Sequence, residues 1–131
     1  MIKNLEIFCV TNKHFNYLNK VKYNLAAVGK NKFPKKYLRC DYGNNIFYKE
    51  EYYSELTFHY WFWKNKLEKY KNKNTWIGFC QKRRFWVKKK NKNFIISNLL
   101  NSPPKEWSNH NSVICEKIFT NNVRFMKMIK R

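Results

Sequence analysis

The chain has very little glycine and very little acidic charge. It holds three glycines in 131 residues, and none of them forms the GxGxxG or P-loop spacing that cradles phosphates. Asp41 is the sole aspartate, so no Asp-x-Asp pair exists to hold a divalent cation against a nucleotide diphosphate. The sequence therefore predicts no metal site and no evident cofactor, although a divalent cation held in another way stays open.

Long apolar runs and paired cysteines are also missing. No uninterrupted apolar run approaches the roughly 20 residues that a membrane-spanning helix needs. The four cysteines Cys9, Cys40, Cys80 and Cys115 form no CxxC pair and have no nearby histidine pair, which excludes the usual zinc spacing. A strand-like run begins almost at Met1, so we expect no signal peptide. Reduced thiols in a cytoplasmic protein are the expectation.

Basic and aromatic residues are abundant instead. Hydrophobic residues make up 44% of the chain and aromatic residues 19%, which predicts a folded domain over residues 1–131. The formal net charge of +20 favours an anionic partner. The lysines have a second explanation, which accounts for them equally well: an AT-rich genome. Such a genome would also produce the scarcity of alanine, which occurs only at Ala26 and Ala27.

Short apolar runs alternate with helical patterns, which predicts an α/β fold with at least partly parallel strands. The predicted strands cover residues 5–10, 24–29, 75–80 and 94–96. The first ends at Thr11, Asn12 and Lys13. Ligands of open α/β sheets collect at the carboxyl ends of strands, so this loop is the first place to expect a ligand.

The stretch SELTFHYWFWKN, residues 54–65, begins a predicted helix with Ser54 as N-cap and Glu55 in its first turn. An apolar stripe at helical spacing extends it toward residue 73: Leu56, Tyr60, Trp63, Leu67 and Tyr70. We expect the stripe residues to pack in the core, and Trp61 and Phe62 to face a second layer. A further helix is expected from Thr120.

Candidate site residues follow from position and chemistry. Glu55 either complements the helix dipole or contacts a ligand, as a base or as an acceptor from a sugar hydroxyl. Arg83 and Arg84 follow the strand of residues 75–80, where guanidinium groups could hold a phosphate or simply form a solvated turn. The isolated histidines are expected to be structural: His14, His59 and His110.

Four segments in this order resemble a known family. Residues 7–13, IFCVTNK, resemble a strand ending in a Thr-His-Lys motif, and residues 27–29, AVG, resemble the Val-Gly segment that follows. Residues 41–65 resemble an Asp-x-x-Gly-Asp-Asn-Ile, Cys-Glu-Leu-Thr and Tyr-Trp-x-Trp-Lys-Asn series. Residues 77–85, IGFCQKRRF, resemble an Ile-Gly-x-x-His-Tyr-Arg-Arg-Tyr-Phe motif. Together they are similar to a bacterial domain of unknown function in capsular and exopolysaccharide biosynthesis proteins.

That family is thought to contain glycosyltransferases of the GT-A, nucleotide-diphospho-sugar type. The resemblance implies a Rossmann-like GT-A fold, incomplete at the C-terminus because family members are longer. It implies a nucleotide-diphosphate sugar as donor and a lipid-linked or oligosaccharide acceptor, with peripheral contact to an anionic membrane surface at the inner face. Asn12 and the pair Gln81–Lys82 stand where the family has His and His-Tyr; if those histidines contact donor or acceptor, this chain is altered or inactive.

The residue chemistry and the resemblance together suggest one mechanism. Arg83, Arg84 and Lys13 would stabilise the departing phosphates, because fixed cations act on charge that develops in the transition state. Amide and carboxylate groups would form hydrogen bonds to sugar or ribose hydroxyls, and the residues expected to do so are Asn44, Asn45 and Glu55. Thr11 and Asn12 complete the expected donor site. Nucleic acid is the less favoured partner, but a basic nucleic-acid-binding module and an inactive truncated remnant remain the alternatives.

Overall fold

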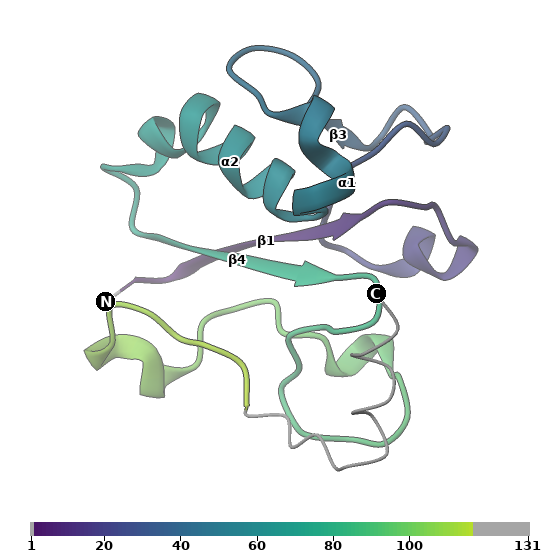
Figure 1. Cartoon of the computed structure of the whole chain (residues 1–131). Coiled ribbons are helices and arrows are strands. Elements are labelled where there is room, and N and C mark those ends of the chain that lie inside the picture. The colour runs from purple at the N-terminus through teal and green to yellow at the C-terminus, as the bar shows by residue number, and fades with distance from the viewer. Residues whose placement is uncertain (1, 117–131) are drawn as a thin grey trace, which may run out of the picture.

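The computed structural model describes residues 2–116, and a parallel sheet lies at its centre (Figure 1). Its strands are β1 (Asn4–Thr11), β2 (Asn24–Ala27), β3 (Leu38–Arg39) and β4 (Thr75–Gln81), in the order β3-β2-β1-β4. All three pairings are parallel. The predicted α/β class is confirmed, and so are the three longer strands; the two-residue strand β3 was not predicted.

One face of the sheet is covered by α1 (Glu50–Tyr53) and α2 (Leu56–Asn65), which lie above the strands in Figure 1. Short 3-10 helices, Phe47–Lys49 and Leu67–Tyr70, flank them. The core between these layers is mainly aromatic and β-branched: Phe8, Val10, Ala26, Val28, Cys40, Phe58, Trp61 and Phe62. Phe8 and Phe62 meet edge to face, with ring centroids 4.8 Å apart.

The opposite face is covered by irregular chain and further 3-10 helices, drawn below the strands in Figure 1. These helices are Ile96–Asn98 and Lys105–Asn109, while Asn16–Lys20, which also contributes to this side, is drawn at the right beyond the ends of the strands. A second core forms there from Cys9, Leu18, Val21, Leu25, Ala27, Tyr37 and Leu99. Residues 94–96 were predicted as a strand, but Phe94 and Ile95 adopt no regular structure and Ile96 begins a 3-10 helix. The helix predicted from Thr120 lies outside the described residues.

The helix predicted from residue 54 toward residue 73 is shorter in the structure, where α2 covers only Leu56–Asn65. The prediction was therefore wrong at both ends. Ser54 is not an N-cap: it ends α1 with φ 50°, and Glu55 takes the N-cap position of α2. Backbone and side chain of Thr57 both donate to the Ser54 carbonyl, at 3.2 and 2.6 Å, which stabilises this unusual conformation. At the other end Lys66, with φ −124°, stops α2 well before residue 73.

The buried face of α2 is also different from the predicted one. Phe58, Trp61 and Phe62 are 0%, 0% and 3% exposed, whereas Trp63 is 57% exposed and Leu67 39%. The Trp61 indole N–H donates to the Tyr42 carbonyl at 2.9 Å, which fixes this orientation. The predicted core stripe therefore lies largely on the outside, and its Tyr60 is only half-buried.

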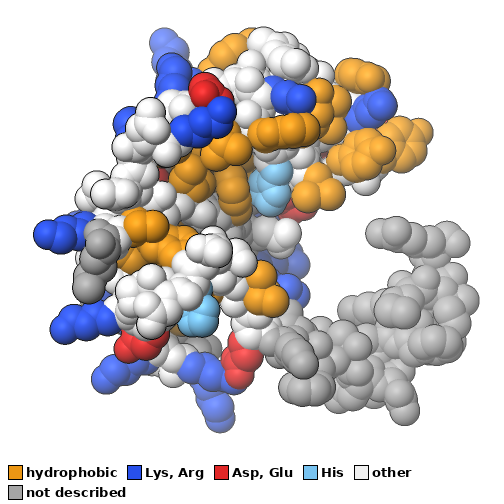
Figure 2. Space-filling model, turned by 90° about the vertical axis from the view of Figure 1, so that its left-hand side faces the viewer, with side chains coloured by type: hydrophobic (Ala, Val, Ile, Leu, Met, Phe, Trp, Pro, Cys, Tyr) orange, Lys and Arg blue, Asp and Glu red, His pale blue; other side chains and the backbone are white. Residues whose placement is uncertain are grey.

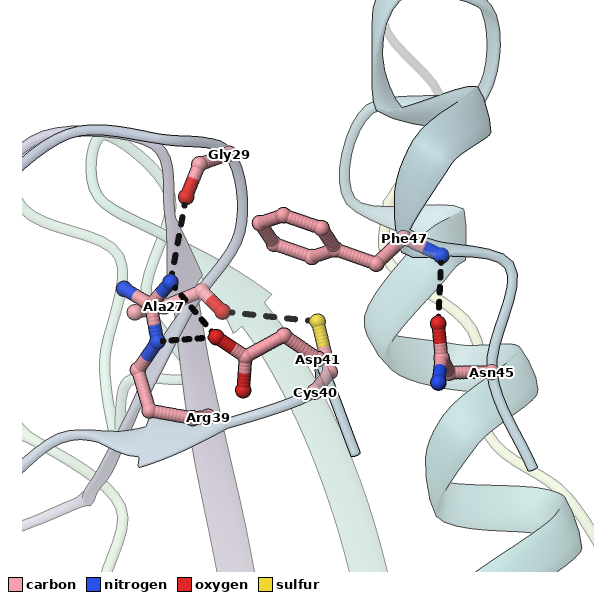
Figure 3. Close-up of polar contacts among 7 residues, drawn as sticks. All are labelled: Ala27, Gly29, Arg39, Cys40, Asp41, Asn45 and Phe47. Atoms are coloured by element: carbon pink, nitrogen blue, oxygen red, sulfur yellow. Dashed lines mark hydrogen bonds and ion pairs between the residues drawn. The ribbon is translucent and has the colours of Figure 1, made fainter. Parts of the chain in front are cut away.

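The cysteines are free in the described chain, and two of them face each other across neighbouring strands. Cys9 of β1 is the register partner of Cys80 in β4. Cys40 follows β3 and donates to the Ala27 carbonyl at 3.5 Å (Figure 3). Burial raises the pKa of the Cys40 thiol to about 11. No helix within residues 2–116 has the length and apolar character needed to cross a membrane.

Candidate functional site

The order of the strands defines a switch point between β1 and β4. From β1 the chain moves to β2 and β3 on one side, and then returns to the other side of β1 to form β4. In open parallel sheets, ligands bind beyond the carboxyl ends of strands where the order reverses in this way. The residues that follow Thr11 and Gln81, the last residues of β1 and β4, therefore form the candidate site.

The loop after β1 is shaped by Thr11. This residue is 1% exposed, and its hydroxyl donates to the Lys13 carbonyl at 2.7 Å and accepts from the Lys13 N–H at 3.2 Å. A side chain that bonds to the backbone two residues later holds a tight turn. Asn12 and Lys13 are thereby presented to solvent. Thr11 thus positions the loop, and Asn12 and Lys13 are the groups available for a ligand.

The chain after β4 reverses in a four-residue turn. Gln81 and Arg84 exchange backbone hydrogen bonds of 3.2 and 3.0 Å, which places Lys82 and Arg83 at the tip. The Lys82 ammonium donates to Asn12 Oδ1 at 2.6 Å. This bond joins the ends of β1 and β4 across the switch point. Sequence reasoning had predicted Arg83 and Arg84 here and treated Lys82 only as a departure from the family.

An aromatic ring brings two cations of this site together. The Phe15 ring centroid lies 5.9 Å from Lys13 Nζ and 5.3 Å from Lys82 Nζ, within cation–π range. Beside it, the Tyr17 hydroxyl donates to the Lys82 carbonyl at 2.5 Å. Burial raises the pKa of Tyr17, and the charge of Arg83 opposes that rise, so Arg83 also lies within electrostatic reach of this cluster.

The cations at the strand ends are not neutralised by carboxylates. Within residues 2–116 the ion pairs are Arg39–Asp41, Lys71–Glu68 and Lys90–Glu116, and none includes Lys13, Lys82, Arg83 or Arg84. Arg83 and Arg84 are exposed. We name Lys13, Lys82, Arg83 and Arg84 the strand-end cations. Uncompensated charge of this kind attracts anions, and phosphate most readily.

The loop after β2 adds to the same edge of the sheet. Asn31 donates to the Asn12 carbonyl at 2.7 Å. Gly29 has φ 78°, and a Cβ added to it would stand 3.3 Å from Cδ of Glu50, so the carboxylate of Glu50 packs closely against this turn. Arg39 donates to the Gly29 carbonyl at 3.4 Å and to Asp41 at 3.1 Å (Figure 3). The described part of the chain contains no group of three metal-ligating side chains.

Glu55 lies one helical turn before His59, at the end of α2 that faces the candidate site. The His59 ring packs on Phe79 of β4, with centroids 4.4 Å apart. Tyr70 follows the end of α2, and its hydroxyl donates to Glu6, near the start of β1, at 2.7 Å. The helix α2 therefore runs from the carboxyl ends of the strands toward their amino ends. Burial lowers the pKa of His59, and Glu55 partly opposes this shift.

Asn44 and Asn45 lie on the loop that follows β3, and their polar groups bond within the fold. Asn44 accepts from the Tyr60 hydroxyl at 3.3 Å, and its backbone exchanges hydrogen bonds with the Asn65 side chain. Asn45 Oδ1 accepts from the Phe47 N–H at 3.1 Å (Figure 3). The structure thus brings Asn12, Lys13 and Lys82 together, and places Asn44 and Asn45 against α2 and the residues before α1.

Sequence reasoning missed several residues of this edge: Phe15, Asn31, Arg39, Glu50 and Lys82. Lys82 belongs to the polar run after the predicted strand, so its place at the end of that strand could be predicted from the sequence. Its hydrogen bond to Asn12 could not. The contact between Asn12 and Lys82 depends on β1 and β4 being neighbours, which no local pattern reveals.

Comparison with models of protein families finds a match for this chain. The model of a family described as "Domain of unknown function (DUF4422)" matches residues 6–128. No curated protein and no solved structure matches this chain.

Proposed function

The chain belongs to the DUF4422 family of domains of unknown function, and we propose that it acts as a glycosyltransferase that takes its sugar from a nucleotide-diphosphate donor. The observation that carries the proposal is the hydrogen bond of 2.6 Å between Lys82 and Asn12, which joins the ends of β1 and β4 at the switch point of a parallel sheet and brings Lys82 beside Lys13. A diphosphate is the anion that such a site fits best, because nucleotides bind at this position in α/β sheets.

Sugar transfer from a nucleotide-diphosphate donor requires that the departing nucleoside diphosphate is stabilised. The bond between the anomeric carbon and the donor's phosphate oxygen breaks, and its electron pair leaves with the nucleoside diphosphate. Lys13, Lys82 and Arg83 stabilise that negative charge as it develops. The acceptor hydroxyl oxygen forms the new bond to the anomeric carbon, and its proton passes to the carboxylate of Glu55, the base in this proposal.

The finer assignment follows from the resemblance of residues 41–65 and 77–85 to capsular and exopolysaccharide proteins. It adds a GT-A type of fold, a cytoplasmic nucleotide sugar as donor and an oligosaccharide or lipid-linked acceptor at the inner face of the membrane. Asn44 and Asn45 would act in this scheme by holding the loop after β3, since their amides bond within the fold.

Titration of the purified chain with free and sugar-linked nucleoside diphosphates, followed by tryptophan fluorescence, tests the proposal. Lys82→Ala is expected to weaken binding by about 10- to 100-fold, because a charge-assisted bond is worth about 1.5–3 kcal/mol. Lys92→Ala removes an equal charge from an exposed loop and is the matched control. Glu55→Gln should retain donor binding and lose transfer.

Single-stranded DNA provides the competing outcome. A nucleic-acid module would bind DNA without sequence preference, lose that binding steeply with salt, and show no discrimination among nucleotides. If Lys82→Ala and Lys92→Ala bind nucleotide sugars equally well, the assignment of the donor site to the strand ends is wrong. Donor binding without any transfer by the unmodified chain would identify an inactive remnant.

A further inference from the structure

A cavity lies toward the opposite end of β4, away from the strand-end cations. It has a volume of about 380 Å³ and includes the first half of β4, from Thr75 to Gly78, in its lining. Three tryptophans form part of its wall: Trp76, Trp86 and Trp107. The segment of residues 110–113 closes another side. We call this the tryptophan cavity.

The residues that line the tryptophan cavity carry no formal charge. They are Ile2, Leu5, Ile7, Thr75, Trp76, Ile77, Gly78, Trp86, Trp107, His110, Asn111, Ser112 and Val113, counting His as neutral. In a chain with 27% charged residues this is a marked exception. Figure 2 views the molecule from the amino ends of the strands; blue side chains are frequent along its left and lower margins, and orange ones gather in the upper part and toward the middle. A phosphate or a carboxylate would find no ionic partner in this lining.

The indole rings are held in place by their neighbours. The Trp107 ring meets Trp76 at a centroid distance of 5.3 Å and Trp86 at 5.8 Å, both close to edge to face. The Trp86 indole N–H donates to the Phe79 carbonyl at 2.9 Å. Gly78 lets Ile7 and Trp86 pack closely against β4, because a Cβ there would stand 3.1 Å from Ile7 Cγ1 and 3.6 Å from Trp86 Nε1. The apolar wall is thus formed before any ligand arrives.

The rim offers neutral hydrogen-bonding groups. The His110 N–H donates to the Trp107 carbonyl at 3.0 Å, which fixes the backbone at the start of the rim. Asn111 and Ser112 are exposed, and their side chains make no hydrogen bond among the described residues. An amide and a hydroxyl together supply donors and acceptors without charge. Rigid aromatic walls with a few neutral polar groups suit a ligand that has both apolar and hydroxylated surfaces.

We propose that the tryptophan cavity binds a neutral saccharide. A sugar ring has apolar C–H faces that pack on indole rings, and hydroxyl groups at its edge that Asn111 and Ser112 can bond. A chain with net charge +20 repels cationic ligands, and the cavity lacks the ionic partners that anionic ligands need. The site is separate from the strand ends, and the inference does not depend on the reaction proposed there.

The test is a titration of the full chain with neutral trisaccharides, using maltotriose, cellotriose, mannotriose and N-acetylchitotriose, with a trigalacturonate as the anionic comparison. Binding is followed by the indole N–H signals of the tryptophans in two-dimensional NMR. At least one neutral trisaccharide should bind and shift the signals of Trp76, Trp86 or Trp107. Trp107→Ala should weaken binding about tenfold or more, as truncation of a central aromatic contact does.

Two variants separate a binding role from a structural one. Asn111→Ala changes an exposed rim residue that the fold does not use and should weaken binding several-fold. Trp63→Ala removes an exposed tryptophan of α2 outside the cavity and should leave saccharide binding unchanged. Absence of binding by every neutral trisaccharide at millimolar concentration would overturn the proposal. Preference for trigalacturonate would also overturn the proposal. So would saccharide binding by Trp107→Ala and by Asn111→Ala that is as strong as binding by the unmodified chain.

Discussion

β1 and β4 are neighbouring strands of similar apolar character, yet they differ in burial. Both were predicted as strands from short apolar runs. The second half of β1 is buried, whereas β4 is half-buried from Thr75 to Cys80. β1 pairs on both sides, and β4 pairs with β1 alone among the described strands. The number of neighbours therefore decides burial here, because both sequences are apolar enough for a core.

The largest expected effect comes from removing register partners of the two strands. Phe8 is 3% exposed and lies opposite Phe79, which is half-buried. Phe8→Ala should lower the free energy of unfolding by about 3–5 kcal/mol, the usual cost of deleting a buried aromatic side chain. Phe79→Ala should cost distinctly less. Urea unfolding measures both, and equal losses would show that the exposed edge of β4 is covered in solution.

The same contrast applies to the two faces of α2. Trp61→Phe keeps a ring in the core but leaves the Tyr42 carbonyl without its donor, which should cost about 1–3 kcal/mol. Trp63→Phe changes a side chain that is 57% exposed and should stay within about 0.5 kcal/mol of the unmodified protein. Thermal or urea unfolding of the matched pair gives the comparison. A larger loss for Trp63→Phe would restore the face that sequence periodicity predicted.

The half-exposed side of β4 also predicts a pH dependence through His59. Burial against Phe79 lowers its pKa in the folded state, so below about pH 6.5 the unfolded chain takes up the proton first. Stability should therefore fall as the pH drops from 6.5 toward the lowered folded pKa. His59→Leu should flatten this part of the curve, measured by urea unfolding between pH 7.5 and 5. An unchanged slope in the variant would assign the dependence to another group.

The smallest expected effect on stability is at the end of β4. Lys82 bonds Asn12 at the surface, so Lys82→Met should change the free energy of unfolding by no more than about 0.5 kcal/mol. The same variant should weaken nucleotide-diphosphate binding by about 10- to 100-fold, as expected for Lys82→Ala. A large loss of stability would make the contact a structural bond between the strands.

Local sequence patterns predicted the three longer strands well, but predicted the helix boundaries and the surroundings of each element poorly. The runs before Thr11 and Gln81 were recognisable as strands because apolar β-favouring residues are followed by polar turns. The face of α2 was not predictable, because residues 56–63 are almost all apolar or aromatic and fit several stripes. The positive φ of Ser54 carries no sequence signal, since glycine is the residue expected there.

The candidate site was predictable only in part, for the same reason. Thr11, Asn12, Lys13, Arg83 and Arg84 were identified because each follows a recognisable strand. Glu50 beside Gly29 and Lys82 beside Asn12 depend on contacts between distant segments. The positions of Asn44 and Asn45 depend on how the loop after β3 packs on α2, which composition does not encode.

The strand order has a consequence for how the chain folds during synthesis. β1 can pair with β2 as soon as Asn24 to Ala27 leave the ribosome, because Phe8 and Asn24 are close in sequence. Its other edge must wait for β4, since Asn4 pairs with Thr75 and all of α2 is made in between. Closing such a long loop is slow. β1 is therefore made before the other three described strands and is among the last of them to gain both of its neighbours.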